Sequence, residues 1–151
     1  MISWQWATFK ELSRDNLFEI LKVRQSVFVV EQHCVYQDAD NLDPKAFHLL
    51  GWNGDKSRSD LVAYARVVLP GEKFIEPSIG RLLTIKSVRG TGLGKKLTSE
   101  AISRTIREFP NASIRISAQK YLEDFYFQFG FNTVSEPYDE DGIPHIEMLR
   151  R

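Results

Sequence analysis

The sequence lacks several features that mark other classes of protein. Its single cysteine, Cys34, rules out an internal disulfide and fits a reducing compartment. No apolar run approaches the roughly 20 residues that a membrane span needs. The first residues do not follow the basic-then-apolar pattern of a signal peptide. Basic and acidic residues number 20 each, so no charge excess indicates a nucleic-acid or membrane-surface partner. From these absences we expect a cytoplasmic protein.

The composition and the apolar periodicity are typical of one α/β domain. Of the 151 residues, 42% are hydrophobic, which suits a single core, so we expect one domain over residues 1–151. Segments that alternate in polarity predict strands, and apolar residues three and four apart predict helices, in the order βαβββαβαββ. The predicted strands are 2–8, 47–52, 61–69, 79–85, 114–118, 131–134 and 145–149. The second and third are joined by a polar turn at 53–60, and the last two by an acidic loop at 138–142. The predicted helices are 14–28, 93–109 and 122–129.

A glycine-rich stretch joins the fourth predicted strand to the second predicted helix. Gly90, Gly92 and Gly94 let the backbone approach a ligand closely and turn its N–H groups inward. The helix that follows adds unpaired N–H groups and the positive end of its dipole. Arg89, Lys95 and Lys96 add positive charge at the same place. The stretch therefore predicts an anion site, most simply for a phosphate. Its spacing is neither the dinucleotide-binding fingerprint nor a Walker loop.

Two motifs resemble the GCN5-related N-acetyltransferases, the GNAT family. The first is the Arg-x-x-Gly-x-Gly stretch, and the second is the Tyr-x-x-x-Gly-Phe pattern formed by Tyr126, Gly130 and Phe131. The match departs from the family at Gln119, where asparagine is usual, and at Leu122, where alanine is usual. Both motifs stand in the order and at the separation that the family has, which is more specific than either motif alone.

The resemblance extends over nearly the whole chain. Residues 27–40 and 138–145 are similar to the ElaA-like branch of the same family. The resemblance implies the acyl-CoA N-acyltransferase fold, a mixed and mostly antiparallel sheet flanked by helices, with splayed central strands. It also implies an acetyl-CoA-dependent N-acetyltransferase without a metal. The acetyl group would move directly to a primary amine of a small molecule or peptide.

The resemblance also implies which residues hold acetyl-CoA. The loop would bind the diphosphate, the fourth strand would bind the pantetheine arm through its backbone, and the end of the fifth strand would contribute one side chain. These residues are Arg89, Gly90, Thr91, Gly92, Leu93, Gly94 and Lys95 in the loop, Leu82, Leu83 and Thr84 in the strand, and Gln119. Tyr126 would donate a proton to the departing thiolate, as a phenol with an ordinary pKa of about 10 can at neutral pH.

The acceptor site is less determined by the sequence. Arg24 interrupts the apolar stripe of the first predicted helix, and either it reaches out to solvent or its guanidinium turns inward to position an acidic group. An acidic segment, 29–44, follows this helix. In GNAT folds this helix borders the acceptor. We therefore expect the acceptor pocket to be lined by Arg24, Phe28, Glu31, Gln32 and His145.

Several alternatives stay open. The general base that amine acetylation calls for could be Glu31, His48, His145 or Glu147. Cys34 is not expected to carry the acyl group, because the family transfers it directly. Two other functions fit the same fold: acyl transfer of the acyl-homoserine-lactone-synthase type, and a non-catalytic acyl-CoA-binding module. The expected partners are acetyl-CoA and an amine acceptor, and the sequence leaves a homodimer open as an assembly.

Overall fold

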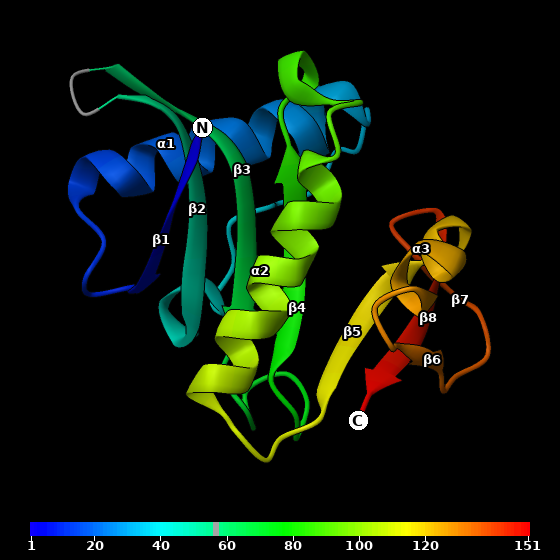
Figure 1. The fold of residues 1–151 in the computed structure, drawn as a ribbon. Coiled ribbons are helices and arrows are strands. Elements are labelled where there is room, and N and C mark those ends of the chain that lie inside the picture. The colour runs from blue at the N-terminus through cyan, green and yellow to red at the C-terminus, as the bar shows by residue number, and fades with distance from the viewer. Residues whose placement is uncertain (56–57) are drawn as a thin grey trace.

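The structure, a computed structural model, describes residues 1–55 and 58–151 (Figure 1). The strands are β1 (Ile2–Thr8), β2 (Ala46–Asp55), β3 (Arg58–Val68), β4 (Ser78–Thr84), β5 (Ile114–Gln119), β6 (Asn132–Thr133), β7 (Tyr138–Glu140) and β8 (Ile143–Arg150). The α-helices are α1 (Arg14–Arg24), α2 (Leu93–Glu108) and α3 (Glu123–Phe127), and the other helical turns are the π-helix Gln25–Glu31 and the 3₁₀ turns Asp43–Lys45, Lys86–Val88 and Lys120–Leu122.

These strands form one mixed sheet. Their order is β1-β2-β3-β4-β5-β8-β6, and β7 pairs with β8. Every described pair of neighbours is antiparallel except β4 and β5. Figure 1 shows α1 and α2 on opposite faces of the sheet and α3 beside β5 and β8. The predicted fold class, a mostly antiparallel sheet flanked by helices, is confirmed.

Two predicted turns are wrong, because strands occupy part of them. The segment 138–142 is a hairpin rather than a loop, since β7 pairs with β8 around Asp141 and Gly142. Both turn residues have positive φ, 53° and 80°, which is typical of a tight hairpin turn. The polar turn predicted after Trp52 is also strand on both sides, with Asn53 opposite Asp60. The central part of that predicted turn, residues 56–57, lies outside the described residues.

The central strands β4 and β5 separate from each other along most of their length. The register between them contains one pair of partners, Ser78 and Arg115. A further backbone bond runs from the N–H of Arg115 to the carbonyl of Pro77 at 3.1 Å. Beyond this point β4 stays paired with β3, and β5 stays paired with β8. The two halves of the sheet therefore open as a wedge toward the C-terminal ends of β4 and β5, visible in Figure 1, and the predicted splay is confirmed.

A β-bulge in β4 sits at the start of this wedge. Tyr64 pairs with Leu83, but Arg66 pairs with Gly80, so β4 holds one extra residue between these pairs. Arg81 lies in this bulge with φ of +51°, which is unfavourable for a residue with a side chain. The extra residue also reverses which side of the sheet each later side chain faces. The bulge thus lets β4 bend away from β5.

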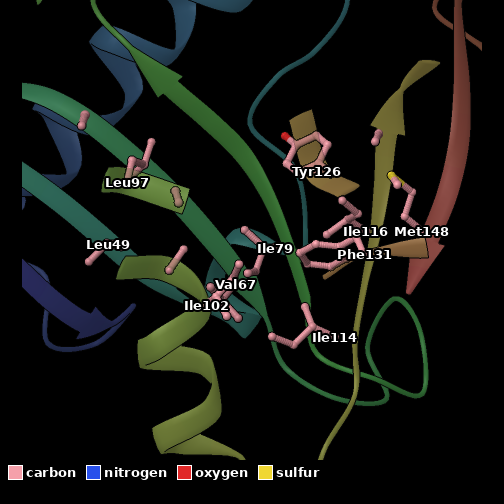
Figure 2. Close-up of a cluster of buried hydrophobic side chains, with 14 of the residues drawn as sticks. Leu49, Val67, Ile79, Leu97, Ile102, Ile114, Ile116, Tyr126, Phe131 and Met148 are labelled. Carbon is pink, nitrogen blue, oxygen red and sulfur yellow. The ribbon is translucent and has the colours of Figure 1, made fainter. Parts of the chain in front are cut away.

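Hydrophobic clusters cover both faces of the sheet. The larger cluster joins α2 to one face through Leu97 and Ile102, and it continues past the wedge to Ile116 and Phe131 (Figure 2). The smaller cluster packs α1 on the opposite face and includes Tyr64. Ile79 belongs to the first cluster and Leu83 to the second. An even strand would place these two on the same face, so their separation is a direct effect of the bulge.

The first helix begins as predicted and ends differently. The Ser13 Oγ accepts a hydrogen bond from the N–H of Asn16 at 3.0 Å and caps the N-terminus of α1. After Arg24 the backbone widens into the π-helix Gln25–Glu31. Short π-helical segments are frequent at functional sites, and this one leads toward the wedge.

A partly buried network of arginines and aspartates fixes the segment that follows the π-helix. Its six members, from α1, β3, the β4 bulge and the segment itself, are Arg24, Arg66, Arg81, Asp38, Asp40 and Asp43. The Arg24 side chain is 1% exposed, and its nitrogens lie 2.7 Å from both Asp38 and Asp43. Arg24 therefore turns inward, and the alternative in which it reaches solvent is wrong. A buried charge of this kind is tolerated only when it is paired and hydrogen-bonded.

The same aspartates, together with Asp40, also form ion pairs with the two arginines at the bulge, one on β3 and one on β4. Arg66 Nη1 lies 2.6 Å from Asp40 and 2.9 Å from Asp43, and Arg81 Nε lies 2.8 Å from Asp38. Arg81 also donates to the backbone carbonyl of Asp38 at 3.1 Å. The network offsets the unfavourable backbone of Arg81 with ion pairs, and it ties α1, β3 and β4 to one segment.

We expect Asp43→Asn to weaken the fold in a pH-dependent way. Burial alone would raise the pKa of Asp43, but hydrogen bonds and charge from Arg24, with help from Arg66, lower it to about 2. The unfolded value is near 4, so the ionised carboxylate stabilises the fold above pH ~4, and this contribution is lost as the pH falls through about 2. The variant should have a lower Tm at pH 7 and a shallower fall of Tm between pH ~4 and ~2.

Thermal melts followed by circular dichroism measure both effects. Asp60→Asn, at an exposed carboxylate on β3, is the matched control and should melt like the unmodified protein across the range. An Asp43→Asn variant with the same pH dependence as the unmodified protein would contradict the ion-pair account.

Candidate acyl-CoA site

A cavity of about 400 Å³ fills the wedge between β4 and β5. One wall is β4 from Ser78 to Leu82, and the facing wall is β5 from Ile116 to Gln119. The segment after α1 closes one end with Phe28, Gln32 and Tyr36, and the β7–β8 hairpin contributes Glu140, Asp141 and His145. The bulge and the single β4–β5 pairing are thus what make room for the cavity.

The cavity passes from one face of the sheet to the other. Tyr126 and Ile116 belong to the cluster on the α2 face. His145 lies opposite Gln119, whereas the next pair, Ala118 and Ile146, faces that cluster. Successive residues of a strand point to opposite faces, so His145 lies on the α1 face. Two molecules could therefore enter from opposite faces and meet inside the wedge.

The glycine loop has the conformation that an anion site needs. Gly90 and Gly92 have φ of +83° and +84°, and a Cβ added to Gly90, Gly92 or Gly94 would meet no atom within 4 Å. Gly92 is the N-cap of α2 and no side chain caps this end, so the first N–H groups of the helix face outward. Thr91 bonds back to the carbonyl of Val88 at 2.6 Å and holds the turn. Open space, uncapped N–H groups and the helix dipole together fit a diphosphate.

The cationic and apolar residues of the loop differ in how far they are exposed to solvent. Lys95 is exposed, while the side chain of Leu93 is 5% exposed and packs in the core under α2. Leu93 can therefore offer only its backbone to a ligand.

The predicted pantetheine residues of β4 face different ways. Leu82 lines the cavity, whereas Leu83 packs against α1. Of the three predicted pantetheine residues, Leu82 is thus the one whose side chain the structure brings to the cavity.

Arg89 bridges the glycine loop and the π-helix. Its Nε and Nη2 donate to the carbonyl of Thr84 at 3.0 and 2.8 Å, and its Nη1 donates to Glu31 at 2.7 Å. The sequence places Arg89 and Thr84 at the cofactor and Glu31 at the acceptor. In the structure Glu31 instead joins Arg89 and does not line the cavity. A diphosphate at the loop would compete with Glu31 for this guanidinium.

The predicted proton donor lies in the cavity wall. Tyr126, on α3, is 9% exposed and lines the cavity, and its ring packs edge-on against Phe131 at 6.1 Å (Figure 2). Burial raises the pKa of Tyr126 to about 12, and Tyr121 adds to the shift. The ordinary value near 10 assumed from the sequence is therefore too low. Gln119, at the end of β5, lines the same cavity.

The structure separates the candidate general bases. His48 is fully buried, with Nδ1 2.6 Å from the hydroxyl of Tyr64 and Nε2 3.0 Å from a backbone carbonyl. Glu147 accepts from Arg115 at 3.0 Å. Neither lines the cavity, and Glu31 does not either. His145 does, so it is the one candidate base that the structure brings to the wedge.

Only some of the predicted acceptor residues line the cavity. Phe28, Gln32 and His145 meet at the cavity, while Arg24 lies behind it and anchors Asp38. Arg66 and Arg81 also line the cavity, and sequence reasoning missed both. The available signal was the same one that marked Arg24, a charged residue inside an apolar run.

The described residues contain no group of three or more His, Cys, Asp or Glu side chains that could hold a metal ion. No helix among them is both long and apolar enough to cross a membrane.

The wedge, its bulge and the uncapped glycine loop define an acyl-CoA N-acyltransferase fold. The family model described as "Acetyltransferase (GNAT) domain" matches residues 28–151. The chain belongs to the GNAT family. It is 41% identical to the protein ElaA of Escherichia coli over 152 residues, covering 99% of this chain and 97% of that one. It is 47% identical to a UPF0039 protein of Synechocystis over 150 residues, covering 99% and 96%.

Solved structures agree with this assignment. The crystal structure of E. coli ElaA matches with a TM-score of 0.91 at 40% identity, and an acyl-CoA N-acyltransferase from Pseudomonas aeruginosa matches with 0.93 at 35%. Each match covers 100% of both chains. A CoA-dependent acyl-homoserine lactone synthase, BjaI, matches with a TM-score of 0.76 at 15% identity, covering 99% of this chain and 82% of that one, which is a likeness of fold alone.

We expect Glu31→Gln to strengthen CoA binding. The substitution keeps the size of the side chain and removes the charge that holds Arg89, leaving the guanidinium free for the diphosphate. A half-exposed ion pair is worth up to about 1 kcal/mol, so affinity should rise by no more than about fivefold. Isothermal titration calorimetry with CoA measures this, and Glu136→Gln, at an exposed glutamate, is the control. Weaker CoA binding in Glu31→Gln would contradict competition.

Proposed function

We propose that residues 1–151 form one N-acetyltransferase domain that uses acetyl-CoA and transfers the acetyl group directly to a primary amine of a small molecule or peptide. The observation that carries this proposal is that β4, one wall of the cavity that contains Tyr126, is followed directly by the glycine loop and the uncapped start of α2. The loop and the start of α2 would bind the diphosphate through Arg89, Gly90, Gly92 and Lys95. Bound acetyl-CoA supplies an acetyl thioester.

The residues around the wedge suit this chemistry. The bulge leaves the backbone of β4 unevenly paired near Leu82, and a backbone N–H there could stabilise the developing oxyanion. Tyr126, with a pKa of about 12, is a weaker acid than a thiol, whose ordinary pKa is about 8.5. It would therefore stabilise the departing thiolate by donating a hydrogen bond rather than by giving up its proton completely. Direct transfer leaves Cys34, which also lines the cavity, without a covalent role.

A panel of amines and peptides, assayed with acetyl-CoA for release of free CoA and by mass spectrometry of the products, tests the proposal. Amine-dependent release with an acetylated amine as the product supports it. An acyl-homoserine lactone formed when S-adenosylmethionine is included as an acceptor would assign the synthase class instead. CoA binding without turnover on any amine would assign a non-catalytic binding module.

We expect Gly92→Asp to abolish most of the affinity for CoA. The substitution places a carboxylate beside the diphosphate site, and like charges at this distance should cost at least about tenfold in Kd at low salt. Gly92 has φ of +84°, so any side chain here strains the backbone. Gly92→Asn is therefore the matched control, with the same size and strain but no charge. Equal CoA affinities for the two variants, measured by calorimetry, would show that the diphosphate does not bind at this loop.

We expect Tyr126→Phe to lower kcat by roughly 10²-fold, because it keeps the packing of the ring and deletes the donor to the thiolate. The Kd for CoA should change little. Since the pKa of Tyr126 is about 12, the phenol of the unmodified enzyme stays protonated throughout the assay range, and neither enzyme should show a basic limb from Tyr126 below pH ~11. A variant with the kcat of the unmodified enzyme, when chemistry limits the rate, would show that Tyr126 only packs.

A further inference from the structure

The β7–β8 hairpin brings a histidine and a glutamate together at the edge of the wedge. The Nδ1 of His145 lies 2.8 Å from the carbonyl of Ile143, and its Nε2 lies 3.1 Å from a carboxylate oxygen of Glu140. Both side chains line the cavity. The carbonyl can only accept, so Nδ1 carries a proton and donates it. This bond orients the ring and leaves Nε2 as the nitrogen directed at Glu140.

The hairpin fixes the backbone of His145 on the scaffold. His145 is 8% exposed, pairs with Gln119 on β5, and lies opposite Tyr138 on β7. The hydroxyl of Tyr138 hydrogen-bonds Ser117, and the two rings of Tyr138 and His145 are 6.1 Å apart. Strand pairing on both sides fixes the backbone of His145, and the bond from Nδ1 to the Ile143 carbonyl orients its ring.

We propose that His145 is the general base for the acceptor amine and that Glu140 is its positioning residue. The proposal rests on the proposed amine acetylation. An amine acceptor enters as an ammonium ion, which must lose one proton before it can attack. In the proposed step an N–H bond of the ammonium breaks, its electron pair stays on the amine nitrogen, and the proton binds Nε2 of neutral His145. The proton later passes to water, and the second proton, which the nitrogen loses when the amide forms, ends on the thiol of free CoA.

The observed contacts match the state that follows this transfer. The two partners of the ring, a carbonyl and a carboxylate, are both acceptors, and the imidazolium donates to both. Glu140 thus stabilises the positive charge that the base gains. Before the transfer, the ammonium can replace His145 as the partner of the Glu140 carboxylate, which is half-exposed, and donate to Nε2; Asp141 lines the same end of the cavity. The geometry therefore favours a cationic primary amine as the acceptor.

The position of His145 also divides the reaction between the two faces of the sheet. Tyr126 lies on the α2 face, where the glycine loop begins α2, and His145 lies on the α1 face. The group at the thiolate and the group at the amine are then on opposite sides of the reacting carbon, and the proton removed by His145 never passes through Tyr126.

The charged and titratable groups that share this cavity with His145 are Glu140, Asp141, Lys73, Arg66, Arg81, Asp40, Tyr36, Cys34, Tyr121 and Tyr126.

Kinetics of three variants test the assignment with acetyl-CoA and the best amine of the panel. His145→Gln should lower kcat/KM for the amine by about 10²-fold or more and remove the acidic limb of its pH profile. Glu140→Gln should lower kcat/KM by a smaller factor, because the ring keeps its bond to the Ile143 carbonyl and loses only its carboxylate partner. His33→Gln, at an exposed histidine, is the control and should leave the profile unchanged. CoA affinity should be unchanged in all three.

NMR of the imidazole rings in the protein without substrates gives a second readout that needs no turnover. The chain has three histidines, so the variants assign each ring signal. The ring nitrogen and proton shifts of His145 should change in Glu140→Gln, which loses the carboxylate at Nε2, and stay unchanged in His33→Gln. Unchanged His145 shifts in Glu140→Gln, or a His145→Gln enzyme that keeps both its kcat/KM and its acidic limb, would overturn the proposal. If the unmodified protein acetylates no amine, the proposed function fails, and the ring shifts still decide whether Glu140 contacts the imidazole.

Discussion

The network of three arginines and three aspartates, buried at Arg24, Arg66, Asp38 and Asp43, is the constraint on which the site depends. Arg24, Arg66 and Arg81 come from α1, β3 and the bulge of β4, and all of them pair with the segment that carries Asp38, Asp40 and Asp43. Buried ion pairs of this kind contribute little net stability, but removing one partner costs roughly 3–5 kcal/mol because a charge is left unpaired. Their effect here is geometric, since they hold the segment after α1 against the bulge and so shape one end of the wedge.

The bulge in β4 opens the sheet, so that the site extends from one face to the other. One extra residue at Arg81 turns the rest of β4 to the opposite face, and β4 departs from β5 after a single pair of partners. The opening reaches from Tyr126 on one face to His145 on the other. Cofactor and acceptor chemistry can therefore stay apart until the two molecules meet. The Glu31–Arg89 ion pair links the two sides, because it joins the π-helix to the glycine loop.

The sequence predicted what local patterns encode and missed what depends on distant pairing. Periodicity located the main strands, and the glycine spacing located the uncapped start of α2. The network stayed hidden because its partners are far apart in sequence, as far as 43 residues for Arg81 and Asp38. A period of two also assumes an even strand, so it could not show that Ile79 and Leu83 face opposite sides. The His145–Glu140 pair was missed because the hairpin was predicted as a loop.

The central claim is that acyl-CoA occupies the wedge, with its diphosphate at the start of α2. Hydrogen–deuterium exchange of the backbone amides, with and without CoA, tests this most directly. The account predicts that CoA slows exchange at residues 90–95 and at the bulge of β4 near Leu82, while β1 and β2 exchange at unchanged rates. Protection confined to other segments, or no protection at residues 90–95 at a saturating CoA concentration, would contradict it.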